Sequence, residues 1–582
     1  MATDSRASGS GERPQTLAVF AEWAAERYGG LPALRLPHGG GDVSYEELRD
    51  TVHTVARGLI GLGVAAGDRV AVLCETRAEW TYAHLGVLAT GAALVPVYPS
   101  AGDEEVAWVL GDSGAGVVLC EDAEKAARVA ALVPGVRPVV MTGEAAPMTH
   151  PAELAPLAAV LARGAAVTRD DLAMIVYTSG TTGLPKGCRL SHGNSGAISD
   201  ATASFEKMEP GDVTYIYLPL AHLLAQLTEL STLLDGATLA FWGGRIEGIV
   251  PELGQVRPTH LPSVPRLFER VHAQVGALAA ADGPEGTARF EAAVALGAHI
   301  DDLRRSGAEP TAAQTRAYEE ADGKLYALVR SVFGGRLRHA NVGGAPIAPQ
   351  TLDFMRACGI PLYEGYGMTE SAGIIALNHP GAHRYGTVGQ PLPGCEVRIA
   401  ADGEILARGP MIFAGYHAAA EATGEALDAE GWLHTGDLGE LDADGYLSVT
   451  GRKKDIIITS SGKNITPSLL EFAIQQSRWV SRAVMIGDRR PYPVALITLD
   501  PDEIAGLGLT GSPAASEQVR GWIQEAVDAA NAKAAGPARI RRFTILDEDF
   551  SVADETLTPT LKIRRAAVAR RYAKEIDGLY ES

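Results

Sequence analysis

The eleven residues YTSGTTGLPKG, Tyr177 to Gly187, decide how this chain is interpreted. They follow the apolar stretch LAMIV, which is typical of a buried strand. Glycines let the backbone approach an anion closely, and successive N–H groups can line one concavity. Hydroxyl groups and Lys186 add donors and a positive charge, so the stretch predicts a phosphate-binding loop. Taken alone, it is equally compatible with a flexible polar connection. The loop residues are Thr178, Ser179, Gly180, Thr181, Thr182 and Gly183.

Helical and strand patterns alternate on both sides of this loop. Ser44 and Glu47 form a capping box that opens a helix running towards Gly61, and a second helix is expected over Glu79–Ala92. The predicted strands are Arg69–Leu73, Leu94–Tyr98, Gly116–Cys120, Leu172–Tyr177, Val213–Leu218 and Thr238–Trp242. Such alternation predicts an α/β fold with parallel sheets.

The length of 582 residues requires more than one domain. We expect a disordered leader at 1–13, a large domain at 14–453 and a small C-terminal domain at 454–582. Few strand formers occur in 268–333, which predicts a helical insertion. Asp-Gly turns at Asp402-Gly403 and Asp444-Gly445 predict hairpins in a β-rich subdomain at 386–450.

The composition limits the possible classes of function and the expected cellular compartment. The formal net charge of −20 argues against a nucleic-acid-binding protein. The five cysteines show no zinc or disulfide spacing, and no signal peptide is apparent, so a cytoplasmic protein is expected. The longest apolar stretch, Leu85–Tyr98, is too short for a transmembrane helix, although a peripheral membrane contact stays open. The sequence does not indicate an oligomeric state.

Six further segments come after the phosphate loop in order and share its resemblance to one family. They are PLAH (219–222), GGAP (343–346), YEGYGMTE (363–370), LHTGDLG (433–439), GRKKDIIITSSGKNITP (451–467) and LTPTLKIRR (557–565). Together with the loop they resemble the adenylate-forming, or AMP-binding, superfamily. YEGYGMTE, the PTLKIRR ending, the helical insertion and VRPTHLPSVPRLFERV (256–271) are similar to long-chain fatty acid–CoA ligases.

This resemblance implies a reaction in two halves. An acid, medium- or long-chain in such ligases, is activated by ATP and Mg²⁺ to an acyl-adenylate, and its acyl group then passes to coenzyme A. The implied fold is a large N-terminal domain of two parallel-type αβ sheets with a small β-rich subdomain, followed by a mobile α+β C-terminal domain. That domain rotates about a hinge at Lys454 and brings the loop Gly462-Lys463-Asn464 near the thiol.

The resemblance also assigns roles to single residues. Lys562 bridges the carboxylate and the α-phosphate, His222 faces the carboxylate and the leaving pyrophosphate, and Lys186 holds phosphates. Glu370, with Thr181, holds Mg²⁺. The nucleotide-contacting positions beyond the phosphate loop are Gly344, Ala345, Tyr366, Gly367, Thr369, Asp437 and Arg452.

Two departures keep other interpretations open. Many relatives carry Glu-Arg where this chain has Ala225 and Gln226, and a serine where it has Val342. A specialised enzyme could use an aromatic, short or unusual oxyacid, with a carrier protein or an amine as acceptor. A non-catalytic nucleotide-binding scaffold would instead be favoured by loss of a key lysine or acid, and here those residues are present.

Overall fold

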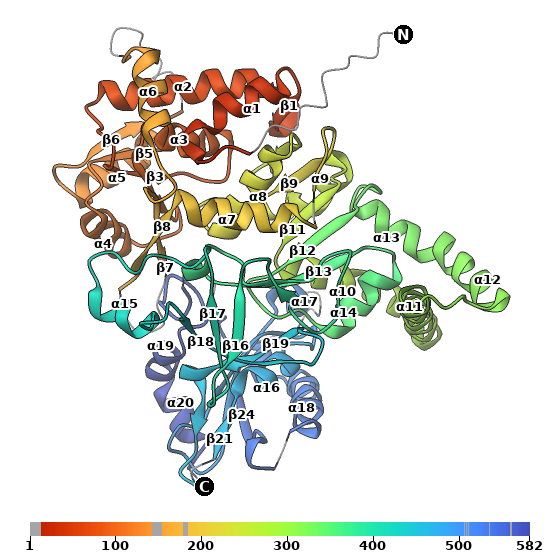
Figure 1. The fold of residues 1–582 in the computed structure, drawn as a ribbon. Helices are drawn as coiled ribbons and strands as arrows, with labels where there is room; N and C mark the ends of the chain where they lie inside the picture. Colours follow the sequence, from red (N-terminus) through yellow and green to blue (C-terminus); the bar gives the residue numbers. More distant parts are fainter. Residues whose placement is uncertain are drawn as a thin grey trace.

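The computed structural model describes residues 13–142, 154–178, 184–205, 207–461, 463–505, 507, 509, 511–534, 536–558 and 562–581. A large body of two sheets and covering helices stands above a smaller C-terminal domain (Figure 1). Arg13, the last residue of the predicted leader, pairs with Asp235 at 2.5 Å, whereas residues 1–12 lie outside the described part. The predicted α/β architecture with a separate small C-terminal domain is confirmed.

The first sheet has six strands and ends at the phosphate loop. Its order is β6 (Arg137–Val140), β5 (Val117–Cys120), β3 (Arg69–Leu73), β4 (Ala93–Val97), β7 (Leu172–Thr178) and β8 (Lys186–Ser191). All neighbours are parallel except β7 and β8, whose antiparallel register places Thr178 opposite Lys186. The two ends of the predicted loop are therefore held together by strand pairing.

The second sheet has nine strands, most of them parallel. Its order is β15 (Gln390–Pro391), β14 (Ala376–Leu377), β13 (Leu362–Tyr366), β12 (His339–Val342), β11 (His260–Ser263), β9 (Val213–Ile216), β10 (Thr238–Phe241), β1 (Pro32–Arg35) and β2 (Asp42–Ser44). The strands from β13 to β1 run parallel, and the antiparallel pairs lie at both edges. In open α/β sheets ligands bind beyond the carboxyl ends of parallel strands. The segments PLAH and GGAP come after β9 and β12 at that edge.

Helices cover the two sheets of the body. They are α1 (Phe20–Tyr28), α2 (Tyr45–Gly61), α3 (Ala78–Ala89), α4 (Asp103–Ser113), α5 (Ala123–Leu132), α6 (Leu157–Ala166), α7 (His192–Ala203), α8 (Leu223–Leu234), α9 (Ile249–Val256) and α14 (Pro349–Ala357). The capping box predicted at Ser44 and Glu47 is present at the start of α2.

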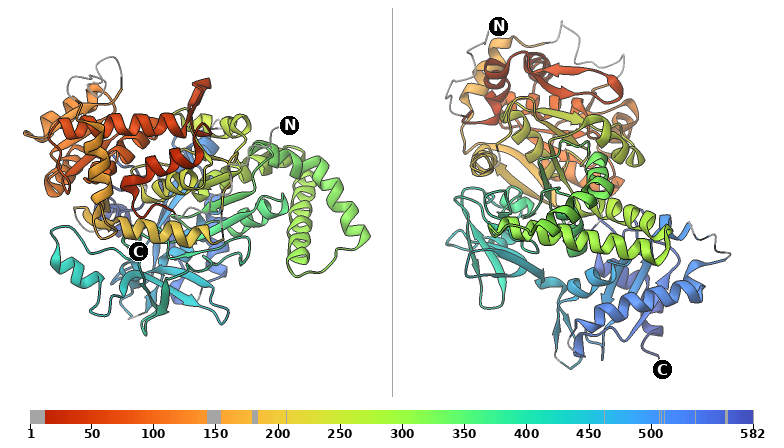
Figure 2. Two further views of the ribbon diagram at one scale, coloured as in Figure 1. Left: turned by 45° about the horizontal axis from the view of Figure 1, so that its top comes forward. Right: turned by 90° about the vertical axis from the view of Figure 1, so that its right-hand side faces the viewer.

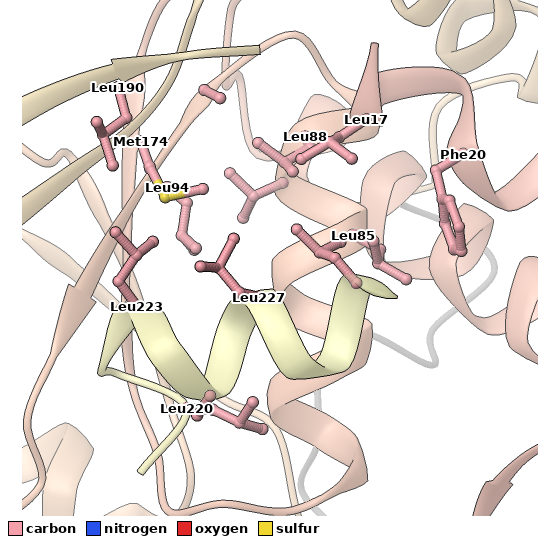
Figure 3. Close-up of a cluster of buried hydrophobic side chains, with 14 of the residues drawn as sticks. Leu17, Phe20, Leu85, Leu88, Leu94, Met174, Leu190, Leu220, Leu223 and Leu227 are labelled. Atoms are coloured by element: carbon pink, nitrogen blue, oxygen red, sulfur yellow. The ribbon is translucent and has the colours of Figure 1, made fainter. Parts of the chain in front are cut away.

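Helix α8 follows β9 and packs against the apolar core of the first sheet. Its Leu223 and Leu227 point towards Met174 and Leu94 of the first sheet (Figure 3). Both leucines are at most 5% exposed, and burying such a side chain contributes about 1.5–3 kcal/mol. This packing fixes α8 between the two sheets.

A helical arm occupies the segment predicted as an insertion. It consists of α10 (Pro265–Ala281), α11 (Gly283–Arg305), α12 (Ala312–Ala321) and α13 (Ala327–Val332). The arm projects to one side of the body (Figure 2). Across the described ranges, none of the helices combines the length and apolarity needed to cross a bilayer.

A four-stranded antiparallel sheet lies between the body and the C-terminal domain. It contains β16 (Glu396–Ile399), β17 (Glu404–Arg408), β18 (Leu433–Leu441) and β19 (Leu447–Arg452), with α15 (Ala420–Ala426) before β18. Gly403 and Gly445 turn the two predicted hairpins with φ of +85° and +82°, a conformation that glycine adopts without strain.

The C-terminal domain has its own apolar clusters. It contains β20 (Ile457–Ile458), β21 (Asn464–Ile465), α16 (Pro467–Ile474), β22 (Val480–Ile486), β23 (Val494–Leu499), α17 (Pro501–Ala505), α18 (Glu517–Ala532), β24 (Arg542–Leu546), α19 (Arg565–Arg571) and α20 (Ala573–Gly578). Arg565 pairs with Glu471 of α16 at 2.5 Å and so fixes the start of α19. This contact also fixes the chain immediately after Lys562.

Candidate active site

A cavity of about 750 Å³ lies where the body, the four-stranded sheet and the C-terminal domain meet. Its wall combines the ends of β7 and β13, the start of α8, the end of β19, and the C-terminal segment around Lys562. The predicted site residues that line it are Thr178, Lys186, His222, Gly344, Tyr366, Gly367, Thr369, Glu370, Arg452, Lys454 and Lys562. The fold thus gathers segments from almost the whole chain.

Asp437 lies at the edge of the cavity and is held from two sides. Its Oδ1 accepts a hydrogen bond from Arg452 Nε at 2.8 Å, because the antiparallel register of β18 and β19 places the two residues opposite each other. Its Oδ2 accepts from the hydroxyl of Tyr366 at 2.7 Å. Burial raises the pKa of Tyr366 well above its ordinary value, so this phenol stays neutral. The carboxylate is 5% exposed and fixed in orientation.

Glu370 is a second buried carboxylate, at the short helical turn after β13. Its Oε1 accepts from the hydroxyl of Tyr416 at 2.7 Å, and Lys186 Nζ lies 5.2 Å from the centre of the Tyr416 ring. Tyr416 therefore connects the acid to the lysine of the phosphate loop. Nowhere in the described ranges do three His, Cys, Asp or Glu side chains gather as a metal cluster. One carboxylate in a phosphate site fits Mg²⁺, which takes few protein ligands and keeps phosphate and water.

His222 begins α8 as its N-cap. Its Nδ1 accepts a hydrogen bond from the backbone N–H of Leu224 at 3.2 Å. Burial, with a smaller contribution from the charge of Lys562, lowers the pKa of His222 to about 4. The imidazole is therefore neutral at pH 7, and with Nδ1 accepting, its proton is on Nε2. His222 is a hydrogen-bond donor in this cavity rather than a cation.

Lys562 enters the same cavity from the C-terminal domain. Its backbone N–H donates to Thr558 Oγ1 at 3.0 Å, and the N–H of Thr558 donates to its carbonyl at 2.8 Å. The side chain is exposed to the open cavity, yet the surrounding protein and the charge of Arg452 lower the pKa of Lys562. The carboxylates of Asp437 and Glu370 act on it in the opposite direction. A cation from one domain therefore faces two carboxylates from the other.

Two glycines of the predicted nucleotide positions have physical reasons to be glycine. Gly344 has φ of +81° and faces the cavity. A Cβ on Gly367 would lie 2.2 Å from the carbonyl oxygen of Gly373, so any side chain would displace the turn that contains Glu370. Ala345, by contrast, is exposed and is not among the described residues that line the cavity.

Some predictions fall outside the described residues or away from the cavity. Ser179, Gly180, Thr181, Thr182 and Gly183 lie outside, as do Gly462 and 559–561. Lys463 is described, and it is not part of the wall in this arrangement of the domains. Lys454 does line the cavity, beside Lys453, which binds Asp402 and Glu404 at 2.6 and 3.0 Å.

Sequence reasoning missed Tyr416 and Lys453. Tyr416 is far from Glu370 in the chain, and only the fold brings its hydroxyl to that carboxylate. The sequence predicted an aromatic contact between the ring of Tyr366 and adenine. It did not predict that the Tyr366 hydroxyl orients Asp437. The hydroxyl of a buried tyrosine usually has a hydrogen-bond partner, and this rule is the one signal that could have predicted the contact.

Comparison with known proteins agrees with this geometry. A family model described as AMP-binding enzyme matches residues 21–417, and one described as AMP-binding enzyme C-terminal domain matches residues 454–582. The long-chain-fatty-acid–CoA ligase FadD15 of Mycobacterium bovis is 38% identical over 560 residues, which cover 93% of this chain and 92% of that protein. ACSBG1 of Bos taurus, also a long-chain-fatty-acid–CoA ligase, is 31% identical over 98% of this chain and 86% of its own.

Solved structures show the same fold at lower identity. O-succinylbenzoate coenzyme A synthetase (MenE) of Bacillus subtilis, in complex with ATP and magnesium, has a TM-score of 0.69 at 22% identity, covering 94% of this chain and 98% of that one. The adenylation domain of a carboxylate reductase from Mycobacterium chelonae has a TM-score of 0.73 at 22% identity, covering 99% and 92%.

Proposed function

Because this chain belongs to the AMP-binding enzyme family and is an AMP-forming acid–CoA ligase of the fatty acid–CoA ligase type, we propose that its acid is a medium- or long-chain fatty acid. ATP and Mg²⁺ convert this acid to an acyl-adenylate, and the acyl group then passes to coenzyme A. The observation that carries the activation step is the convergence of Lys562, His222 and Glu370 from two domains in one cavity.

The first half-reaction joins two anions, so charge must be neutralised where they meet. The carboxylate oxygen attacks the α-phosphorus, and negative charge builds on the phosphoryl oxygens. Lys562 supplies a cation, and its low-dielectric surroundings strengthen that interaction. His222 donates through Nε2 without adding a second charge, since its pKa is about 4.

The remaining predicted residues bind and orient ATP. Asp437, fixed by Arg452 and Tyr366, accepts hydrogen bonds from the ribose hydroxyls. Lys186 and Thr178 hold the β- and γ-phosphates at the end of β7. Glu370 would hold the magnesium ion, which supplies charge neutralisation for the phosphates when bound.

The fatty acid assignment draws on the relatives and on α8. FadD15 and ACSBG1 are named as long-chain-fatty-acid–CoA ligases. Next to His222 the wall of the cavity is formed by Leu223, Leu224 and Leu227, which suit a hydrocarbon chain.

The second half-reaction requires a different arrangement of the C-terminal domain. Withdrawal of Lys562 would open the cavity, with Lys454 as the hinge and Lys463 and Asn464 approaching the thiol. All five cysteines are unpaired and buried, which agrees with action in the reducing cytoplasm.

An ATP–pyrophosphate exchange assay across a panel of straight-chain, aromatic and short acids tests the proposal. Exchange should require Mg²⁺ and be fastest with medium- or long-chain acids, and the complete reaction with coenzyme A should release AMP and pyrophosphate. Stoichiometric ADP, or exchange confined to aromatic or short acids, would contradict the proposal. Replacing coenzyme A by an amine or a carrier protein distinguishes the acceptor.

A further inference from the structure

One face of α8 lines the cavity from His222 to the end of the helix, and its chemistry changes along the way. The lining positions of α8 recur at helical spacing, so they form a single stripe. The first three are Leu223, Leu224 and Leu227, and the last three are Thr228, Ser231 and Thr232. The wall is therefore apolar near His222 and carries hydroxyl groups farther away.

A second row of polar side chains meets this hydroxyl end. Register pairs His260 of β11 with Thr214 of β9 on one side and with His339 of β12 on the other, so the three side chains lie side by side. All three line the cavity, and each is at most 7% exposed. Thr232 Oγ1 lies 2.9 Å from Thr214 Oγ1, which joins the helix stripe to the strand row.

The chain topology shows that this polar end is remote from the reacting groups. His260 and His339 are the first residues of β11 and β12, whereas His222 and Gly344 lie beyond the carboxyl ends of their strands. Helix α8 starts at the carboxyl edge and runs back, so Ser231 lies about 14 Å along its axis from His222. That length matches an extended medium-length acyl chain.

From this arrangement we propose that the acid carries a hydroxyl group at the end of its chain remote from the carboxyl group. The inference rests on the proposed function and specifies its substrate class. Thr228 and Ser231 are the specificity-determining residues, with the row Thr214, His260 and His339 opposite them. The leucines nearer His222 contact the hydrocarbon part.

The hydrogen bonds at the far end fit a substrate that donates. Thr228 Oγ1 donates to the carbonyl of Leu224 at 2.9 Å, and Thr232 Oγ1 donates to that of Thr228 at 2.7 Å. With its own proton used on the helix, Thr228 Oγ1 is left as an acceptor towards the cavity, whereas Thr232 Oγ1 is also hydrogen-bonded to Thr214 Oγ1. A buried substrate hydroxyl is costly without a partner, and the oxygen of Thr228 offers one here.

The test compares ω-hydroxydodecanoate with dodecanoate, which differ only at the far end, in ATP–pyrophosphate exchange. We expect the hydroxy acid to have a kcat/KM about tenfold higher, the effect of one net hydrogen bond. Ser231→Ala and Thr228→Val should each reduce this ratio to about one. Thr54→Val removes the same kind of helix hydroxyl, which donates to the carbonyl of Asp50 on α2 away from the cavity, and is the matched control.

The outcomes separate this inference from the ligase assignment. Exchange with dodecanoate but no preference for the hydroxy acid overturns the inference and leaves the proposed function standing. A preference that survives both variants overturns the roles of Thr228 and Ser231. No exchange with any acid overturns the proposed function and this inference with it.

Discussion

The two halves of the cavity are built in different ways. On the proposed nucleotide side, Asp437 and Glu370 are each held by a tyrosine hydroxyl at 2.7 Å, and both belong to short contiguous motifs. On the proposed acid side, the wall takes single side chains from β9, β11 and β12 and a stripe from α8.

This difference shows how each half of the cavity would recognise its ligand. A nucleotide presents the same phosphates and ribose to any enzyme, so a few residues in fixed local geometry are sufficient. An acyl chain is recognised by the shape and polarity of a long wall, which single substitutions can change. Substitutions in the nucleotide half should therefore change adenylate formation or ATP binding. Substitutions behind the acid half should change the stability of the helix that forms its wall.

The largest effect is expected from Lys562→Ala, which removes the cation that the C-terminal domain contributes. Adenylate formation should slow by about two to three orders of magnitude, or roughly 2.7–4 kcal/mol. Supplying a synthetic acyl-adenylate with coenzyme A bypasses that step, and the variant should then react at a rate near that of the wild type.

Arg570→Ala is the control for this prediction, because Arg570 is an exposed basic residue of α19 in the same domain. If the positive charge of the tail were all that mattered, both variants would lose equally little. Equal damage to both half-reactions in Lys562→Ala would indicate a structural role and remove the support for two domain arrangements.

Asp437→Ala should weaken ATP binding more than acid binding. A buried carboxylate that accepts from two ribose hydroxyls contributes about 2–4 kcal/mol, so the KM for ATP should rise roughly thirtyfold to a thousandfold. Asp444→Ala, which removes an exposed acid paired with Arg384 in the same sheet, should leave that KM unchanged. An unaltered KM in Asp437→Ala would argue against the ribose role.

The acid half depends on a contact behind α8. Glu229 Oε2 lies 2.8 Å from His84 Nδ1 of α3, and both side chains are fully buried. Glu229→Leu should lower the free energy of unfolding by about 2 kcal/mol, because the imidazole N–H loses its acceptor. Glu229→Gln keeps an acceptor and should lose less. Denaturant unfolding measures both, and equal losses would show that the hydrogen bond is unimportant.

A pH-dependent effect concerns Glu364 of β13, which accepts from the N–H of Gly386 at 2.9 Å. Burial raises the pKa of Glu364 to about 7, against 4.5 for an ordinary glutamate. Folding therefore favours the protonated carboxyl, and this contribution to stability is full below pH 4.5 and is lost as the pH rises through about 7. Relative to Glu364→Gln, the wild type should lose stability between about pH 5 and about pH 8. Apparent Tm values of the two proteins at both pH values test this, and a constant difference would contradict it.

The sequence by itself determined the architecture and pointed to the residues proposed for the nucleotide half. Alternating periods predicted β3 with its observed bounds and the capping box of α2, because these patterns depend on local backbone geometry. Small deviations, such as β4 ending at Val97 before Tyr98, reflect where strand pairing stops. The motifs pointed to Asp437, Glu370 and Lys562, because the phosphate and ribose chemistry proposed for them needs fixed residue types at short spacing.

Only the tertiary structure decided which partners these residues have and what the acid wall is made of. Tyr416 reaches Glu370 through a side-chain hydrogen bond from a connecting segment far along the chain. Thr214, His260 and His339 form one row through the pairing of strands far apart in the chain. Thr228 and Ser231 in a helix are ordinary residues until a cavity opens beside them. Such contacts arise from strand order and helix packing, which local sequence patterns do not specify, since each residue alone is compatible with an unremarkable buried position.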